Sequence, residues 1–158
     1  MDRRLLVKAS GDLCGNKNAI AFVRSLALDN PLDHIVFEGG GGSHASQKLE
    51  EAGYEVVYDY RFTPPRRITK TPAEKLTVAT ALAKERNAWT AAFRGLANVQ
   101  VVSSFQWPGG MPVNTNGDDL VWLWFTEFDA TYVLTLAGRI KSKEKIFGRF
   151  PEIKIIPF

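Results

Sequence analysis

Cysteine is nearly absent from this sequence, and so are the long apolar runs of membrane proteins. The single cysteine, Cys14, cannot form a disulfide within the chain, and residues 1–20 contain no apolar segment of signal-peptide length. The longest apolar stretch, 120–128, is interrupted by Thr126 and Glu127 and is far shorter than the roughly 20 residues of a transmembrane helix. We therefore expect a cytoplasmic protein that has no membrane span.

Histidine and net charge are also in short supply. His34 and His44, together with one cysteine, do not form the ligand set of a zinc site, and they do not suggest a nucleophilic triad. The 20 basic and 17 acidic side chains leave a net charge of only +3. The one basic cluster, within 61–70, is short, and the rest of the chain is balanced. We therefore expect no metal held by protein ligands and no nucleic-acid partner.

The chain is long enough to form one hydrophobic core. Its 158 residues are 45% hydrophobic, and a chain of this size buries most of its apolar surface without disulfides or metal ions. We predict a single domain over residues 1–158. Apolar runs predict strands at 3–9, 34–37, 99–102, 131–136 and 153–156, and helical spacing predicts helices at 19–28, 43–52, 72–84, with a shorter continuation to 96, and 120–128.

The alternation of strands and helices predicts an α/β fold. Strands that are apolar on both faces are typical of a mostly parallel sheet covered by helices on each side, which gives a three-layer αβα sandwich. The strand at 153–156 is expected at an edge of the sheet, because Pro157 has no N–H to donate to a neighbour. Gly53 is expected to end the helix before it.

The segment from 64 to 74 contains a turn followed by a helix start. Pro64, Pro65 and the two arginines after them are turn-like and basic, and we expect them on the surface. Thr71 and Glu74 have the spacing of a capping box, with Pro72 at the first helical position. A helix beginning at Pro72 is therefore predicted.

In open parallel sheets, ligands bind beyond the carboxyl ends of the strands. The loops after Val7, Phe37 and Val102 are therefore expected to share one rim, with the loop after Leu136 as a further candidate. The four glycines at 39–42 follow one of these strands. Glycines let backbone N–H groups approach an anion closely, and the helix that follows adds a favourable dipole. A plain tight turn is the alternative, and the lysine and serine of a P-loop are missing.

Two further groups of polar residues accompany these loops. Lys8 ends the first predicted strand, where it would either face the same rim or be solvated. The run 114–119 supplies two asparagines and two aspartates at a helix start. These side chains either cap the helix or bind a polar ligand and orient lysines or Mg²⁺.

The order of these motifs resembles the amino acid kinase family, in particular its acetylglutamate kinase-like and uridylate kinase-like members. Residues 7–11 resemble the opening strand of that family, and 35–42 resemble its second glycine loop. Residues 67–69 are similar to the Arg-hydrophobic-Thr element of acetylglutamate kinases, and 114–118 resemble their Asn-x-Asn-Ala-Asp motif. The resemblance spans nearly the whole chain and implies an amino-acid-kinase-like sandwich that binds ATP, Mg²⁺ and a small acidic ligand.

The resemblance also implies a role for each matched residue. A lysine would stabilise charge on the transferring phosphoryl group, glycines would cradle phosphates through backbone N–H groups, and an aspartate would orient the lysine. An arginine and two asparagines would hold the acceptor. The implied catalytic residues are Lys8 and Asp118, the phosphate-binding residues are Gly11, Gly40, Gly41 and Gly42, and the substrate-binding residues are Arg67, Asn114 and Asn116.

The sequence also departs from the family pattern. Glu38 and Gly39 stand where an apolar residue and a histidine often precede the glycines, so an additional acid is expected near the phosphates. The family continues with a nucleotide-binding lobe that carries a second lysine. Here an acceptor lobe at about 1–104 would be followed by a C-terminally shortened nucleotide lobe at about 105–158. The lysines within 141–145 either replace the second lysine or, as the preferred interpretation, belong to a solvated charged loop.

Two functions follow from these expectations. The first is an ATP-dependent phosphotransferase acting on a small carboxylate or phosphate acceptor. The alternative is a kinase-like binding or assembly module that has no catalytic activity. Aromatic residues expected at the surface, Trp107, Trp122 and Phe158, suggest a homo-oligomer in either case.

Overall fold

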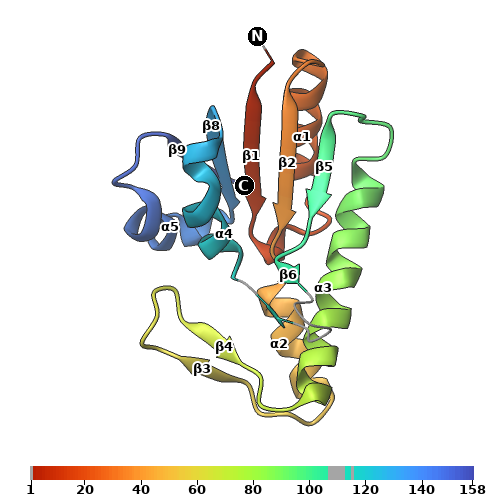
Figure 1. The fold of residues 1–158 in the computed structure, drawn as a ribbon, viewed down its shortest axis with the longest axis vertical. Coiled ribbons are helices and arrows are strands. Elements are labelled where there is room, and N and C mark those ends of the chain that lie inside the picture. The colour runs from red at the N-terminus through yellow and green to blue at the C-terminus, as the bar shows by residue number, and fades with distance from the viewer. Residues whose placement is uncertain (1, 107–112, 115) are drawn as a thin grey trace.

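The core of the molecule is a single parallel sheet flanked by helices. The computed structural model describes residues 2–106, 113, 114 and 116–158. Five strands lie in the order β5-β2-β1-β8-β9, and each neighbouring pair is parallel. Figure 1 shows these strands side by side. Their bounds are β1 Arg4–Ala9, β2 His34–Gly39, β5 Val99–Val102, β8 Ala130–Thr135 and β9 Ile153–Pro157.

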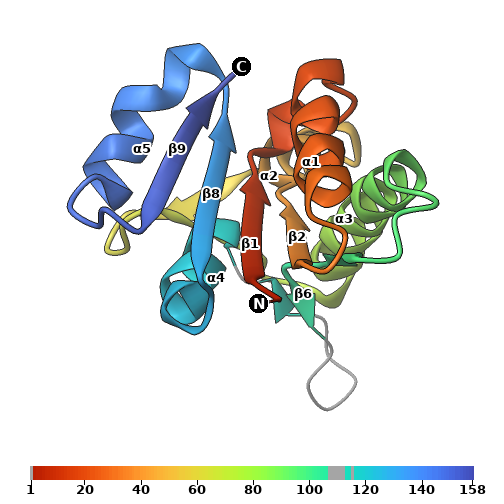
Figure 2. The ribbon, with the colours of Figure 1, turned by 90° about the horizontal axis from the view of Figure 1, so that it is seen from above.

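Helices cover both faces of the sheet. One face packs against α1 (Lys17–Asp29) and the C-terminal half of α3 (Pro72–Ala92), and the other against α4 (Gly117–Trp124) and α5 (Ile140–Phe147). Figure 2 shows α1 and α3 beside β1 and β2, and α5 beside β9. The predicted three-layer sandwich with its mostly parallel sheet is confirmed, and β9 lies at an edge as expected.

Strand β1 forms at the centre because almost every side chain in it is buried. Leu5, Leu6 and Val7 are at most 1% exposed. A short, continuously apolar run of this kind is typical of a parallel strand that is covered on both faces. The N-terminal strand was predicted from this feature of the sequence, and it positions Lys8 at the carboxyl edge.

Helix α3 is longer than the sequence pattern suggested. Its capping box is present as predicted, with Thr71 accepting from the Glu74 N–H and the Glu74 side chain accepting from the Thr71 N–H. The helix then continues to Ala92, so that the two predicted helical segments are one. The physical reason is that no glycine or proline occurs between Pro72 and Gly95, where the backbone turns to φ 87°.

A second layer of structure lies beyond the carboxyl ends of the strands. Helix α2 (Gly42–Glu51) packs against the N-terminal half of α3 around Ala45, Leu49 and Val78. Strands β3 (Val57–Asp59) and β4 (Arg66–Ile68) form an antiparallel hairpin next to α2. This hairpin, and the small pair β6 (Phe105–Gln106) and β7 (Val113–Asn114), were not predicted. Gly53, at φ 82°, follows the end of α2 as expected.

The main error in the predicted elements lies at residues 140–147. The preferred interpretation was a solvated charged loop, but these residues form helix α5. Ile140, Lys143 and Phe147 recur on the helix face that is turned toward the sheet, and Lys143 is only 9% exposed. A lysine therefore occupies a position that normally holds an apolar side chain. Helix α4 is also shorter than predicted and passes into a 3₁₀ turn at Phe125–Glu127.

The aromatic side chains that suggested an oligomer are largely packed within the chain. Trp122 contacts Phe147 and Phe150, with ring centroids 5.5 and 4.8 Å away, and Phe158 contacts Phe22. Both are half-buried rather than exposed, and Trp107 lies outside the described residues. No helix in the described ranges combines the length and the apolar character of a membrane span.

Candidate functional site

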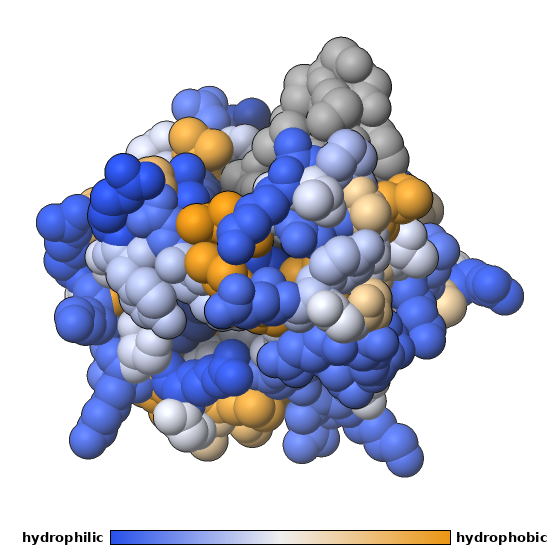
Figure 3. All heavy atoms as spheres, turned by 90° about the horizontal axis from the view of Figure 1, so that it is seen from below, coloured by the Kyte–Doolittle hydropathy of each residue, from blue (hydrophilic) through white to orange (hydrophobic). Residues whose placement is uncertain are grey.

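A cavity of about 820 Å³ opens at the carboxyl edge of the sheet. Its walls come from the loops after β1, β2 and β5, from α4 and α5, and from the β3–β4 hairpin. The loops predicted to share a rim therefore do so, because all five strands point the same way. Seen from below, this end of the molecule is mostly hydrophilic, and small apolar groups lie between charged ones (Figure 3).

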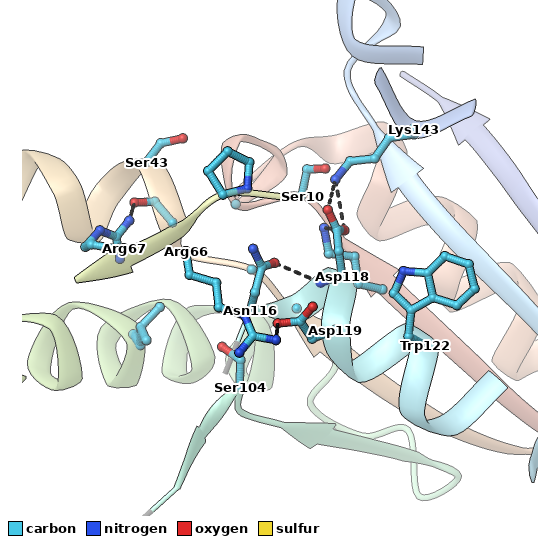
Figure 4. Close-up of a pocket in the computed structure, with 18 of the residues that line it drawn as sticks. Ser10, Ser43, Arg66, Arg67, Ser104, Asn116, Asp118, Asp119, Trp122 and Lys143 are labelled. Atoms are coloured by element: carbon cyan, nitrogen blue, oxygen red, sulfur yellow. Dashed lines mark hydrogen bonds and ion pairs between the residues drawn. The ribbon is translucent and has the colours of Figure 1, made fainter. Parts of the chain in front are cut away.

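The centre of the cavity is a buried group of three charges. Asp118, in the first turn of α4, accepts from two lysines. Its Oδ1 lies 2.9 Å from Lys8 Nζ, and its Oδ2 lies 2.6 Å from Lys143 Nζ. Figure 4 shows the side chain of Lys143 directed at the carboxylate of Asp118, with dashed lines between them. All three residues are less than 10% exposed, so two buried ammonium groups share one carboxylate.

The electrostatics of this group follow from burial and from the shared carboxylate. Burial alone would raise the pKa of Asp118, but Lys8 and Lys143 together outweigh it and lower the pKa to about 2. Burial, followed by repulsion from Lys8, lowers the pKa of Lys143 to about 8. Burial opposes the charge of Lys8 too, yet Asp118 and Glu38 hold its pKa above the ordinary value. At neutral pH both lysines are therefore predominantly charged.

The glycine loops lie directly against each other. A Cβ on Gly11 would stand 2.6 Å from the carbonyl oxygen of Gly40, and the Gly40 N–H donates to the carbonyl of Ala9 at 2.8 Å. A Cβ on Gly41 would stand 2.6 Å from Leu82. Packing between the loops therefore requires glycine at position 11, whatever the ligand, whereas the contact at Gly41 is with the end of a side chain in α3. Gly42 is different, since a Cβ there would meet only the Arg67 guanidinium, at 3.7 Å.

The first turn of α2 adds donors at this edge. Gly41 is its N-cap residue and offers no side chain to accept from the N–H groups of the first turn. Unsatisfied N–H groups at a helix start favour an anion. Ser43, in the same turn, also lines the cavity. The cavity therefore combines two ammonium groups with free backbone donors.

The β3–β4 hairpin forms another wall of the cavity and contacts two helices, α2 and α4. Arg67 donates to the carbonyl oxygen of Gly42 and, at 2.9 Å, to the hydroxyl of Ser46, both in α2. Arg66 lies 3.1 Å from Asp119 in α4. Arg67 thus lines the cavity as expected, although its guanidinium also has internal partners.

Of the two predicted asparagines, Asn116 has a described side chain and Asn114 does not. Asn116 lines the cavity and caps α4, since its Oδ1 accepts from the Asp118 N–H at 3.0 Å. The capping interpretation of this run is therefore correct at Asn116. Asn114 is the last residue of β7, but its side chain lies outside the described part of the structure.

The structure brings together Lys8, Gly11, the glycines of the second loop, Arg67, Asn116 and Asp118 around one cavity. The preferred interpretation of the sequence did not place Lys143 there, although the alternative for the lysines within 141–145 did, and Arg139, which pairs with Asp12 at 2.7 Å, was not predicted. A signal for Lys143 was present in the sequence, because Ile140, Lys143 and Phe147 have helical spacing. Lysine is rarely buried, so the pattern was interpreted as a charged loop.

The cysteine and the histidines that the structure describes are not placed as a nucleophilic or metal centre. Burial, assisted by Glu85, raises the pKa of the Cys14 thiol to about 12, so it stays protonated at neutral pH. His44 is engaged with Glu85, at 2.7 Å. The described residues contain no group of three or more histidines, cysteines or carboxylates that could hold a metal ion.

Comparison with known proteins supports the fold but not the expected family. No protein-family model matches the sequence, and no curated protein is similar to it. N-acetylglutamate synthase from Neisseria gonorrhoeae, solved in complex with coenzyme A and L-arginine, is similar in structure with a TM-score of 0.64 and 11% identity. The similarity covers 85% of this chain and 44% of that one, so the chain spans less than half of the synthase.

A second solved structure gives only a weak match. Ferredoxin-NADP⁺ reductase from Plasmodium falciparum, as its H286K mutant with 2′P-AMP, has a TM-score of 0.38 and 12% identity over 99% of this chain and 52% of that one. A score this low carries no argument.

The expected membership of the amino acid kinase family is therefore wrong. The structural neighbour is a synthase, and no family model supports the kinase motifs. The residues that carried the resemblance have structural roles of their own. Gly11 and Gly40 allow two loops to touch, and Asn116 caps a helix. Short motifs of glycine and asparagine can arise from such requirements in unrelated α/β chains.

Proposed function

We propose that this chain binds the phosphate groups of ATP at the carboxyl edge of its sheet and transfers a phosphoryl group to a small carboxylate or phosphate acceptor. The observation that carries the proposal is the pair of buried ammonium groups, Lys8 and Lys143, held on Asp118 beside the backbone donors of the glycine loops. Phosphoryl transfer requires mainly positioning and positive charge from the protein, and this cavity supplies both.

Each part of the cavity has a place in this reaction. An acceptor oxygen attacks the terminal phosphorus, the bond between that phosphorus and the bridging oxygen breaks, and ADP leaves with the bonding electrons. Lys8 and Lys143 stabilise the charge that spreads over the phosphoryl oxygens, and Asp118 keeps both ammonium groups in place. Arg67 and Asn116 lie where they can hold the acceptor.

The carboxylates of the cavity favour an acceptor that is already an anion. Among the described lining residues, Asp118 and Asp119 are the only carboxylates, and both are in ion pairs. Neither is free to remove a proton from a hydroxyl acceptor. Carboxylate and phosphate oxygens need no such base, because they carry no proton at neutral pH that must leave.

Mg²⁺ would accompany ATP as its counterion rather than occupy a site built by the protein. The paired aspartates leave no set of free carboxylates among the described residues. We therefore assign no step to the metal ion. Both ATP and Mg²⁺ are parts of the proposal.

A second candidate function is binding without transfer. The internal partners of Arg67, which donates to Gly42 and Ser46, favour it, because the arginine must exchange them to hold an acceptor. In that case the cavity would bind an anion but would not turn it over.

The substitution Lys8→Ala tests the first function. We expect ATP turnover, measured as ADP release with a panel of small carboxylates and phosphates, to fall by about 10²–10³-fold, as for the loss of one transition-state donor. Lys84→Ala, an exposed lysine of α3, is the control and should leave turnover unchanged. Circular dichroism checks that both variants fold. Undiminished turnover in folded Lys8→Ala would contradict the proposal, and binding of ATP without turnover in the wild type would support the second candidate.

A further inference from the structure

Glu38 is a buried acid whose place in the fold is not explained by packing. It stands at the carboxyl end of β2 and is 1% exposed. Neither carboxylate oxygen has a hydrogen-bond partner of normal geometry among the described residues. The Ser104 hydroxyl is the one group whose interaction favours the carboxylate as a hydrogen-bond donor would, outside that normal geometry. A buried carboxylate with so little hydrogen bonding is costly, and natural cores rarely retain one without a function.

The register of the sheet places Glu38 next to the charged group of the cavity. Lys8 in β1 is its direct partner across the parallel pair, so the two side chains leave the same face of the sheet. The start of α4 covers this face, where a Cβ on Gly117 would stand 2.5 Å from Glu38 Oε2. Glu38 does not line the cavity itself. It therefore acts on a bound anion through its charge and not by direct contact.

The groups that act on the pKa of Glu38 come from β1, α4, α5 and the loop after β5, and burial acts more strongly than any of them. Lys8 of β1 and Lys143 of α5 favour its ionised form, Asp118 of α4 opposes that form, and Ser104 after β5 favours it through its hydroxyl. Burial is the largest influence and raises the pKa of Glu38 to about 7. Near neutral pH the carboxyl group is therefore present in both forms.

We propose that Glu38 is a positioning residue that makes anion binding in the cavity depend on its protonation, an inference that rests on the proposed function. When Glu38 is protonated, the two ammonium groups of Lys8 and Lys143 face one carboxylate, and the group has a net positive charge. When Glu38 is ionised, they face two carboxylates and the net charge is zero. A bound anion is attracted to the first state more strongly than to the second.

Linkage gives the sign of the effect. An anion that prefers protonated Glu38 must raise the affinity of Glu38 for its proton, so binding near neutral pH takes up a proton from solution. Affinity is then highest below the pKa of Glu38 and falls as pH rises through it. A purely structural role for Glu38 would not produce this dependence.

The test is a titration of the full chain with sulfate at several pH values between 5.5 and 8.5. Sulfate is a tetrahedral dianion whose own charge does not change in this range. We expect wild-type affinity to fall roughly tenfold between pH 6 and pH 8. In Glu38→Gln the affinity should stay near the wild-type level of pH 6 up to about pH 7 and fall only as Lys143, with its pKa of about 8, loses its charge. Calorimetry in two buffers of different ionisation enthalpy should show proton uptake in the wild type and much less in Glu38→Gln.

Two controls distinguish the titration of Glu38 from that of its neighbours and from a loss of folding. Lys143, with its pKa of about 8, also loses charge at high pH, so Lys143→Met should retain the step near pH 7 and lose the later one. Proton uptake in the wild type needs no variant, so a Glu38→Gln chain that fails to fold does not prevent the test.

The outcomes distinguish the two proposals. Sulfate binding that shows the same pH dependence in Glu38→Gln and in the wild type, or wild-type binding without proton uptake, would overturn the role of Glu38 and leave the anion site intact. If the wild type binds neither sulfate nor ATP at any pH, both the proposed function and this inference are overturned.

Discussion

The two faces of the central sheet are built from the same strands, but only the second carries buried charges beside its apolar cluster. Leu5, Val7 and Ala9 point to one face, where they meet α1 and α3 in an apolar cluster. Lys8, between two of them in sequence, points to the other face, toward Asp118 and Lys143. Successive side chains of a strand alternate between its two faces, so neighbouring residues of β1 point into the core and into the charged site. The first face therefore provides stability, and the second carries charges that stability alone does not require.

The largest loss of stability is expected on the apolar face. Trp89 is fully buried, its ring lies 4.7 Å from that of Phe37, and its indole fills the space beside Gly39. Trp89→Ala should lower the free energy of unfolding by about 4 kcal/mol, because a large cavity is left in the core. Urea denaturation measures the change.

The control for this change is Leu123→Ala, which removes a side chain that is 65% exposed. It should cost less than about 0.5 kcal/mol. Equal effects of the two substitutions would contradict the assignment of this face as the main source of stability.

A smaller loss is expected on the charged face. Asp118→Asn removes the carboxylate that both buried ammonium groups share and leaves only Glu38 as a nearby counter-charge, and breaking a buried pair of this kind costs about 3 kcal/mol. The pKa of Asp118 is lowered to about 2, so its contribution is present above the pKa of an unfolded aspartate and is lost as pH falls from about 4 through 2. Urea denaturation at pH 7 and at pH 3 measures both effects.

Asp119→Asn is the matched control for this charge. Its partner Arg66 is half exposed, so the loss should stay below about 1 kcal/mol. If the free energy of unfolding of Asp118→Asn equals that of the wild type at every pH down to 3, the buried carboxylate contributes nothing through its charge.

The parts of the fold that could be predicted are those in which local pattern and tertiary packing agree. The apolar run of β1 and the capping box at Thr71 were sufficient for their elements. The end of α3 was misjudged because the polar stretch around Lys84 and Arg86 hides its continuity. The β3–β4 hairpin escaped prediction because three residues per strand give no alternation to detect.

The parts of the candidate site that could be predicted are those whose position follows from the parallel direction of the strands. Parallel strands bring their ends together, so Lys8 and the glycine loops met as expected, and the additional acid at Glu38 was expected near them. Its complete burial could not be read from the sequence, because it depends on the start of α4 lying over it. Lys143 was missed for a similar reason, since only packing against the sheet shows that its helix turns a lysine inward.

The most direct test of the central claim is a calorimetric titration of the full chain with ATP at pH 7. We expect saturable binding that Lys143→Met weakens roughly tenfold, equivalent to about 1.4 kcal/mol, since one of the two ammonium groups of the cavity is lost. Lys145→Met, an exposed lysine on the same helix, should bind as the wild type does. Absence of ATP binding in the wild type, or unchanged affinity in Lys143→Met, would contradict the account.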